Sequence, residues 1–402
     1  GLPHIGIQGI FDDESGPTHG NPDGAPALYA AMGDTVLAMP GVRALYETPA
    51  VALVFDPVTR EVKGVRAQGA SGEISIKARK GVILTTGDYA NAPDLLSGFN
   101  YANMPIATCG TPADTGDGLR MAAAVGAKLE HMTNSSIDWT GAAFRRPTEE
   151  YGVAFYYNYG GMMEPEFAHG SKIVVNRAGN RFMNEEMLLT GLQHNRNAAD
   201  LRFLDIKTTP MTADGDYEHM PMFMVMDSKV VDNEPLLVNE GKGWRCKHGV
   251  YNWSEDNQTE IERGWVLRAD TLEELAGLMT SKTLMKKSEV SVDAAGLEAT
   301  VEAFNEGCET GEDAFGRTVF DALDTPPYYA VELMPCVVYV EGGPAVDVQQ
   351  RVLDWADQPI ARLYAAGNVA LGGELMPYGL AGCIGMGMDA GANSAALENW
   401  DA

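Results

Sequence analysis

The glycine-rich stretch LYAAGNVALGGELMPYGLAGCIGMGMDAG, residues 363–391, determines the expected fold. It begins as a short apolar strand, continues through a glycine-rich loop and ends in a segment with helical character. Such a unit presents backbone N–H groups to a phosphate-bearing or planar cofactor. A loop of this kind normally follows the first strand of a nucleotide-binding domain, whereas here it lies close to the C-terminus.

The composition indicates a large globular protein that does not bind nucleic acid. The chain has 402 residues, of which 45% are hydrophobic and 21% charged, enough for a sizeable core and two domains. Acidic residues outnumber basic ones 56 to 29, and the net charge of −27 argues against nucleic acid and anionic membrane surfaces as partners. No stretch approaches the roughly 18 consecutive apolar residues of a membrane span.

Familiar catalytic and metal-binding signatures are missing from the sequence. The 5 cysteines form no C-x-x-C pair, so we expect buried reduced thiols, and the 7 histidines show no metal-ligand spacing. No metal site is therefore expected. The segment GMGMDA, residues 385–390, formally matches G-x-G-x-x-A, but no strand stands directly before it and no acid follows about 20 residues later.

Hydrophobic patterning predicts two strand-rich parts separated by a mixed insertion. In the first part, residues 25–39 have helical spacing and residues 52–68 form a hairpin. From about residue 147 the sequence becomes aromatic and irregular, with a hairpin turning at residues 178–179 and two capped amphipathic helices. Near residue 320 strands return, and the glycine-rich stretch quoted above follows.

Seven segments resemble, in order, the flavoprotein subunit family of fumarate reductase and succinate dehydrogenase, which includes the 3-ketosteroid dehydrogenases. The segments are GVILTTGDYANAPDLL, TGDGLRMAAAVGAKL, KIVVNRAGNRFMNEE, LEATVEAFNEGCETGEDAFGR, PPYYAVELMP, GGPAVDVQQRVLD and PIARLYAAGNV. The resemblance implies an α/β fold with an α+β insertion, in which a capping domain interrupts a Rossmann-like FAD-binding domain. The expected boundaries are 1–146 for the first part of the FAD-binding domain, 147–320 for the capping or substrate domain, and 321–402 for the C-terminal return.

One unit of the family is not found in this chain. Family members begin with a strand, a G-x-G-x-x-G turn, a helix and a second strand ending in an acid, so the FAD-binding domain is expected to be incomplete at its N-terminus. Three explanations are open: the chain is part of a longer or processed protein, the unit lies on a partner chain, or the nucleotide site has been lost. Missing central strands would expose apolar surface and unpaired strand edges, so a second chain or omitted segment is expected.

The resemblance places FAD against the C-terminal stretch. The strand before Gly367 would end beside the ribityl chain, and a helix beginning near Gly382 would point its free N–H groups at the pyrimidine edge of the flavin. There they would stabilise the charge of the reduced state by about 0.3–1 kcal/mol. The family usually has an acid at the position of Asn368 and an Asn at that of Gly382. The expected cofactor-binding residues are Val51, Thr86, Gly87, Asp117, Gly367, Asn368, Gly382, Cys383 and Ile384.

The cations that fumarate reductases use are replaced in this sequence. The Arg that protonates the substrate corresponds to Leu189, and the Arg that clamps a carboxylate corresponds to Tyr378. The His expected before Gly342 corresponds to Val338 or Tyr339. A dicarboxylate in a closed site without these cations would face uncompensated desolvation. A neutral substrate is therefore expected.

Two tyrosines and one glutamate are the expected catalytic groups. Tyr378 lies in the loop before the helix and Tyr339 at the other wall, and a phenol can donate a hydrogen bond to a carbonyl or exchange a proton. Ketosteroid dehydrogenases have Y-P-G-x-G in this loop, whereas this chain has M-P-Y-G-L-A-G, so its Tyr is shifted by one residue. Glu185 or Glu186 would relay protons, unless it braces Arg181. A pocket for a flat apolar substrate is expected from Tyr151, Tyr156, Tyr157, Tyr159 and Leu189.

These features indicate an FAD-dependent oxidoreductase that transfers hydride through flavin N5 at a C–C single or double bond next to a carbonyl. The expected substrate is neutral and apolar, such as a steroid-like or phenolic enone. The alternatives are a fumarate-type reductase of an unsaturated carboxylate and a non-catalytic subunit of a larger flavoprotein complex. The expected partners are the small-molecule substrate, the second chain or omitted segment of a hetero-oligomer, and an electron-transfer partner. The expected compartment is the cytoplasm or the bacterial cell envelope.

Overall fold

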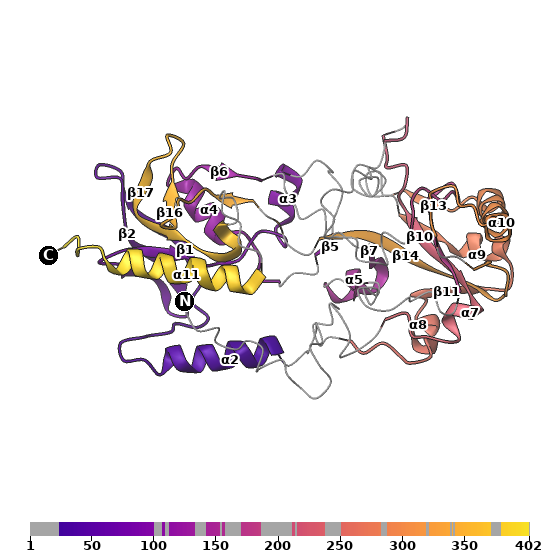
Figure 1. The fold of residues 1–402 in the computed structure, drawn as a ribbon, viewed down its shortest axis with the longest axis horizontal. Coiled ribbons are helices and arrows are strands. Elements are labelled where there is room, and N and C mark those ends of the chain that lie inside the picture. The colour runs from indigo at the N-terminus through magenta and orange to yellow at the C-terminus, as the bar shows by residue number, and fades with distance from the viewer. Residues whose placement is uncertain are drawn as a thin grey trace. The chain divides into compact units, whose positions relative to one another are not determined.

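The computed structural model describes residues 24–99, 107–108, 112–132, 142–152, 155–156, 170–185, 211–213, 215–237, 251–282, 288–318, 321–337, 340, 342–370 and 379–401. The chain forms two compact units, each built from three separate pieces of sequence. The first unit comprises residues 1–42, 104–109 and 138–336, and the second comprises residues 43–103, 110–137 and 337–402. Figure 1 colours the chain by residue number, so the pieces that form each unit can be located with its colour bar.

A six-stranded mixed sheet forms the centre of the second unit. Its strands are β1 (Ala50–Asp56), β2 (Glu61–Gly69), β3 (Gly72–Lys77), β4 (Val82–Leu84), β16 (Arg351–Leu353) and β17 (Pro359–Ala365). β1, β2 and β3 make an antiparallel meander, and β17 pairs in parallel with both β2 and β4. The hairpin predicted for residues 52–68 is confirmed. Its turn is held by the side chain of Asp56, which accepts hydrogen bonds from the backbone of Val58 and Thr59 at 2.9 and 3.3 Å.

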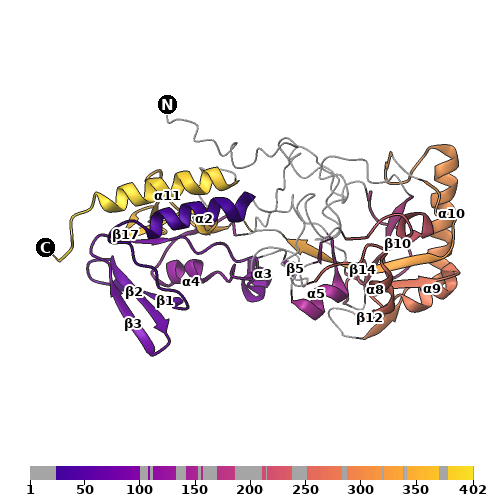
Figure 2. The same cartoon turned by 90° about the horizontal axis from the view of Figure 1, so that it is seen from below.

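Two helices cover this sheet and complete one hydrophobic core. The remaining elements of the unit are α3 (Pro93–Phe99), α4 (Asp117–Ala124), β6 (Leu129–Glu130), β15 (Gly343–Pro344), the 3-10 helix η5 (Gly367–Ala370) and α11 (Gly379–Ala395). Met121 of α4 and Met386 of α11 lie in the same buried cluster as Leu363 of β17. Figure 2 shows α11 running along β17. α4 lies within the segment TGDGLRMAAAVGAKL, which was quoted above for the family resemblance.

A seven-stranded sheet forms the centre of the first unit. Its strands are β5 (Ala107–Thr108), β7 (Ala142–Phe144), β8 (Phe155–Tyr156), β9 (Lys172–Val175), β10 (Met222–Asp227), β11 (Val266–Ala269) and β14 (Tyr328–Val337), and a separate pair is β12 (Thr280–Lys282) and β13 (Glu289–Ser291). Its helices are α2 (Gly24–Leu37), α5 (Arg145–Tyr151), α7 (Ser228–Val231), α8 (Gln258–Glu262), α9 (Leu272–Leu278) and α10 (Ala294–Thr310). The two capped helices predicted in the insertion are confirmed as α9 and α10, capped by Thr271 and Asp293. None of the described helices is long and apolar enough to cross a lipid bilayer.

Strand β14 lies in the first unit, although its sequence was expected to open the C-terminal return at residue 321. The antiparallel register pairs residues 222–227 of β10 with residues 328–333 of β14. Tyr329, Ala330 and Val331 are consecutive and all buried, as in a strand covered on both faces. Apolar continuity predicts that such a strand is buried, but it does not say in which sheet. The observed division consequently differs from the expected boundaries, because residues 1–42 and 321–336 belong to the first unit.

The predicted hairpin turn at residues 178–179 is present and packs directly on helix α10. The side chain of Asn176 accepts hydrogen bonds from the backbone N–H groups of Ala178 and Asn180 at 3.0 and 3.1 Å. Gly179 has φ +75°, and a Cβ atom there would lie 2.3 Å from the backbone nitrogen of Leu297. A Cβ atom on Gly296 would lie 2.0 Å from the carbonyl oxygen of Ala178. Backbone therefore packs against backbone, which requires glycine on both sides.

We predict that Gly296→Ala destabilises the protein by about 1–3 kcal/mol, because the added methyl group overpacks this contact and outweighs the gain in helix propensity. Gly277→Ala in α9 is the matched control, since nothing lies within 4 Å of its Cβ position. The control is expected to be neutral or stabilising by up to about 1 kcal/mol. Guanidinium unfolding followed by tryptophan fluorescence measures both variants. Equal midpoints for the two would contradict the packing described.

Candidate functional site

The carboxyl ends of two parallel strands meet in the second unit. Residues 82–84 of β4 pair in register with residues 363–365 of β17, and the backbone N–H of Ala366 donates to the carbonyl oxygen of Leu84 at 2.9 Å. The chain leaves β4 through Thr86 and Gly87, and leaves β17 through Gly367 and Asn368. Ligands of α/β proteins bind at this end of parallel strands. Four of the residues expected to bind the cofactor are thus brought to one edge of the sheet.

Glycines allow the neighbouring segments to approach this edge closely. Gly87 and Gly367 have φ values of +73° and +75°, a left-handed conformation that turns the chain sharply out of each strand. A Cβ atom on Gly118 would lie 2.1 Å from the Oγ1 atom of Thr86, so the N-terminal turn of α4 abuts the end of β4. Asp117 opens that turn and its side chain is exposed. The free N–H groups of the first turn of α4 therefore lie beside Thr86.

Helix α11 begins earlier than expected. The predicted start was near Gly382, but the helix begins at Gly379, so the backbone N–H groups without intrahelical partners belong to residues 379–381. Gly382, Cys383 and Ile384 lie half-buried in the second turn. The correction moves the positive end of the helix by about one turn towards the preceding loop.

Cysteine 383 connects α11 to the end of β17. Its Sγ atom donates to the Oδ1 atom of Asn368 at 3.6 Å, which is within reach for a sulfur donor. Burial raises the pKa of the Cys383 thiol, so the group stays protonated and keeps this donor at neutral pH. The structure thus brings together Asn368 and Cys383, two residues that the sequence predicted to lie next to the flavin.

Aspartate 88 is a part of this edge that the sequence analysis missed. Its Oδ1 atom accepts from the N–H of Ala90 at 2.7 Å, and its Oδ2 atom accepts from the N–H of Val340 at 3.2 Å. The side chain of Asn368 is also hydrogen-bonded to the carboxyl group. Burial, and then the neighbouring carboxylate of Asp114, raise the pKa of Asp88 to about 7. The available signal was an acid only four residues beyond an apolar strand, at the end where ligands bind.

The residues at this edge fit an FAD molecule. Glycine backbone at the ends of β4 and β17 suits a planar ring system, and the first turns of α4 and α11 offer N–H groups to negative charge. Thr86 and Asn368 add side-chain hydrogen-bonding groups at the same edge. Val51 is the exception among the predicted ligands, because it lies on β1 and its side chain is 49% exposed. Its role stays a prediction.

Several predicted residues lie outside the described part of the chain. These are Tyr339, Tyr378, Tyr157, Tyr159, Leu189 and Glu186. Tyr156 is described only as backbone of β8. The catalytic roles of the two tyrosines, and the substrate pocket, therefore stay predictions.

Glutamate 185 is buried among arginines of the first unit. Its two carboxylate oxygens accept from the Nε and Nη2 atoms of Arg181 at 2.9 and 2.6 Å. The N–H of Val174 donates to it at 3.0 Å, and Arg317 approaches at 3.5 Å. Arg181 is also paired with Asp313 at 2.6 Å. The expected bracing of Arg181 is confirmed, and these contacts account for Glu185 structurally, while a role in proton transfer stays a prediction.

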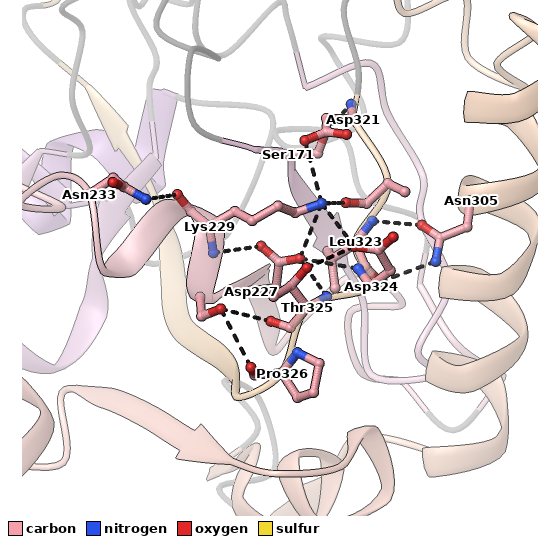
Figure 3. Close-up of polar contacts among 12 residues, drawn as sticks. Ser171, Asp227, Lys229, Asn233, Asn305, Asp321, Leu323, Asp324, Thr325 and Pro326 are labelled. Atoms are coloured by element: carbon pink, nitrogen blue, oxygen red, sulfur yellow. Dashed lines mark hydrogen bonds and ion pairs between the residues drawn. The ribbon is translucent and has the colours of Figure 1, made fainter.

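Lysine 229 is surrounded by acids of the same unit. Its Nζ atom lies 2.9 Å from Asp324, 3.4 Å from Asp321 and 3.6 Å from Asp227, and it also donates to the carbonyl oxygen of Ala322. Figure 3 shows how these groups converge on the amine. Asp227 is held in turn by the backbone N–H groups of residues 324 and 325, and burial raises its pKa. The charge of Lys229 is thus balanced by the protein itself.

The charge of Arg145 is also balanced by carboxylates of the protein. It donates to Glu332 at 2.8 Å and to Glu149 at 2.9 Å. Glu332 is 4% exposed, so the pair is largely shielded from water. Arg145, Arg181 and Lys229 are each neutralised by carboxylates of the chain, and they are consequently poor clamps for a substrate carboxylate.

Within the described segments, no group of three or more His, Cys, Asp or Glu side chains is arranged to hold a metal ion. The described part of the candidate site offers backbone N–H groups, amide, hydroxyl and thiol side chains, and the Asp88 carboxyl group.

Comparisons with known proteins agree with the geometry. A family model described as FAD binding domain matches residues 14–383. The 3-oxosteroid 1-dehydrogenase of Mycolicibacterium smegmatis is 29% identical over 339 residues, which are 79% of this chain and 51% of that protein. The vinyl phenol reductase of Lactiplantibacillus plantarum is 26% identical over 400 residues, which are 91% of this chain and 71% of that protein. The chain thus spans about half the length of the dehydrogenase that it matches.

The same fold occurs among solved structures. A flavocytochrome c3 fumarate reductase in its open conformation superposes with a TM-score of 0.58 at 22% identity. The superposition covers 93% of this chain and 55% of that chain. The expected mixed helix-and-strand fold of a flavoprotein is confirmed at this level.

We predict that Glu185→Gln destabilises the protein by about 3 kcal/mol, because it leaves two buried guanidinium groups without their shared carboxylate. Glu149→Gln is the matched control, since Glu149 pairs with Arg145 but its side chain is 58% exposed. The control is expected to cost less than about 0.5 kcal/mol. Urea unfolding measures both. A Glu185→Gln variant of unchanged stability that loses turnover would instead support proton transfer by Glu185.

Proposed function

Because the chain belongs to the FAD binding domain family, we propose that it forms part of an FAD-dependent oxidoreductase acting at a C–C bond next to a carbonyl. The observation that carries the proposal is the convergence of Thr86, Gly87, Gly367, Asn368 and Cys383 at the carboxyl ends of β4 and β17. In this proposal the second unit is the FAD-binding domain and the first unit is the capping domain that carries the substrate.

The residues of the second unit would hold and orient the flavin. FAD, when bound, supplies hydride transfer at flavin N5. Gly367 and Asn368 would lie beside it, and the N-terminal turn of α11 would stabilise negative charge on the ring by about 0.3–1 kcal/mol. Thr86 and the first turn of α4 would contribute further hydrogen bonds. Each of these contributions is a fixed dipole or donor that needs no rearrangement during the reaction.

We further propose that the substrate is neutral and apolar, such as a steroid-like or phenolic enone. Leu189 and Tyr378 stand where carboxylate-binding enzymes of the family have arginine, and the described cations Arg145, Arg181 and Lys229 are paired internally. The names of the relatives, a 3-oxosteroid dehydrogenase and a vinyl phenol reductase, agree with this class. In this proposal Tyr378 donates a proton or hydrogen bond to the substrate, and Tyr339 assists from the other wall.

A further segment would complete the FAD-binding domain. Among the described strands, β4 pairs with β17 and with no strand along its other edge. On α11, which packs on β4, Leu380 and Met388 are 53% and 59% exposed and stand eight residues apart on one face. We propose that a β-α-β segment, on a second chain or elsewhere in a longer protein, pairs with β4 and binds the adenosine half of FAD.

Native mass spectrometry of the protein purified from its source tests the FAD site and the completing segment together. We expect one FAD, bound either to a complex of this chain with a second polypeptide or to a single polypeptide longer than 402 residues. Detection of the 402-residue chain alone, without the added mass of FAD, would contradict both proposals and would favour a non-catalytic role.

We predict that Tyr378→Phe lowers kcat by about 10²–10⁴-fold, because the phenol O–H is removed from the proton-transfer step, while FAD remains bound. Turnover is measured with a 3-oxosteroid, a vinyl phenol and fumarate. Tyr46→Phe is the control, since Tyr46 is 74% exposed and is expected to leave kcat unchanged. The proposed role of Tyr378 fails if the variant turns over every accepted substrate at the original rate. Turnover of fumarate alone would favour the carboxylate reductase instead.

A further inference from the structure

The buried carboxyl group of Asp88 joins three segments of the second unit. It lies just beyond β4, accepts from the N–H of Ala90 and reaches across to the N–H of Val340, 252 residues further along the chain. Its backbone carbonyl oxygen accepts from the N–H of Gly116 at 3.0 Å. The side chain is only 2% exposed. A carboxyl group in this position is held in one orientation by the fold.

A hydrogen-bonded chain leads from Asp88 to helix α11. The carboxamide of Asn368 is hydrogen-bonded to Asp88, and because this contact lowers the pKa by favouring the ionised carboxylate, the NH₂ group of Asn368 is the donor. The Oδ1 atom of the same carboxamide accepts from the thiol of Cys383. Both ends of the Asn368 side chain are therefore occupied, and its orientation depends on Asp88. Asn368 and Cys383 are the residues proposed above to lie nearest the flavin.

We propose that Asp88 is a positioning residue that links proton binding in the second unit to the charge state of the flavin, acting through Asn368 and Cys383. The inference rests on the proposed FAD site and deepens it. It assigns to Asp88 two effects, the orientation of the Asn368 carboxamide and the uptake of one proton when the flavin becomes more negative.

The groups that face Asp88 determine whether its pKa is raised or lowered. Asp114 lies against Gly87, where a Cβ atom would be 2.3 Å from its Oδ1 atom, and its charge disfavours ionisation of Asp88. Tyr89 is buried, donates to the carbonyl oxygen of Met132 at 2.7 Å, and its own pKa is raised by burial and by Asp88. The thiol of Cys383 is connected to Asp88 through the side chain of Asn368. Burial and Asp114 raise the pKa of Asp88, whereas the hydrogen bonds from Ala90, Val340 and Asn368 lower it.

The sign of the effect follows from these surroundings. In the unfolded chain Asp88 ionises near its ordinary pKa of 3.8, whereas in the folded unit its pKa is about 7. Between these values the folded protein binds one more proton, so its stability falls as the pH rises from about 4 to about 7. Reduction by a hydride donor adds negative charge to the flavin, which raises the pKa of Asp88 further. Reduction just above pH 7 is thus accompanied by uptake of up to one proton from solvent at Asp88.

The test is the pH dependence of the flavin midpoint potential in the protein purified from its source, with its partner segment. In the unaltered protein we expect the midpoint potential to fall more steeply with pH just above pH 7. The additional slope corresponds to one additional proton per two electrons. Asp88→Asn cannot titrate and is expected to lose this additional slope. Asp94→Asn, a change at an exposed acid of the same unit, is the control and should retain it. Asp114→Asn should move the steep region to lower pH.

A second variant separates positioning from folding. Asn368→Ala keeps Asp88 but removes the link to Cys383, so the additional slope should weaken. The decrease in thermal stability between about pH 4 and pH 7 should persist in this variant and disappear in Asp88→Asn, a comparison that does not require bound FAD. Identical slopes in the unaltered protein and Asp88→Asn would overturn the inference and leave the FAD site standing. Absence of FAD from the unaltered protein would overturn the FAD site and the inference together.

Discussion

The parallel pairing of β4 with β17 is the constraint on which the second unit depends. The paired residues of these strands lie 281 positions apart in sequence, yet Val82 faces Leu363 and Leu84 faces Ala365 in register. The register places the turns that follow both strands at one edge of the sheet. Gly87 and Gly118 then let Asp114 and Thr86 approach closely, because neither glycine carries a Cβ atom, and Gly367 turns the chain out of β17 with a φ of +75°. The proposed flavin site is a consequence of that one pairing.

The two units treat buried charge differently. In the first unit, the buried carboxylates of Glu185 and Glu332 each lie between two guanidinium groups, so both have partners of opposite charge. In the second unit, Asp88 is surrounded by backbone N–H groups and an amide, and its neighbour Asp114 carries charge of the same sign. The first arrangement pairs each of these two carboxylates with arginine side chains. The second leaves a carboxyl group that titrates in the physiological range, which is where a functional site can use it.

The differences between the expected and the observed fold have a common cause. Local signals, such as the turn at Asp56, the cap at Asp293 and the glycine turn at Gly179, were sufficient for the hairpins and helices. Strand β14 was expected in the C-terminal part, but its partners β10 and β11 lie upstream in the first unit. The sequence of an apolar strand does not indicate which sheet the strand will join. The start of α11 was similarly misplaced, because the helix begins at Gly379 in a segment rich in glycine, which has a low helix propensity.

The sequence by itself determined the class of protein, the positions of most helices and hairpins, and the glycine-rich turn with Gly367, Asn368 and Cys383. These depend on periodicity, capping and backbone conformation, which act over a few residues. Only the tertiary structure decided that Arg317 approaches Glu185 and that Asp88 faces Val340 and Asn368. Such contacts bring together residues more than a hundred positions apart, and whether a carboxylate meets a cation or another acid there depends on strand pairing that no local pattern contains.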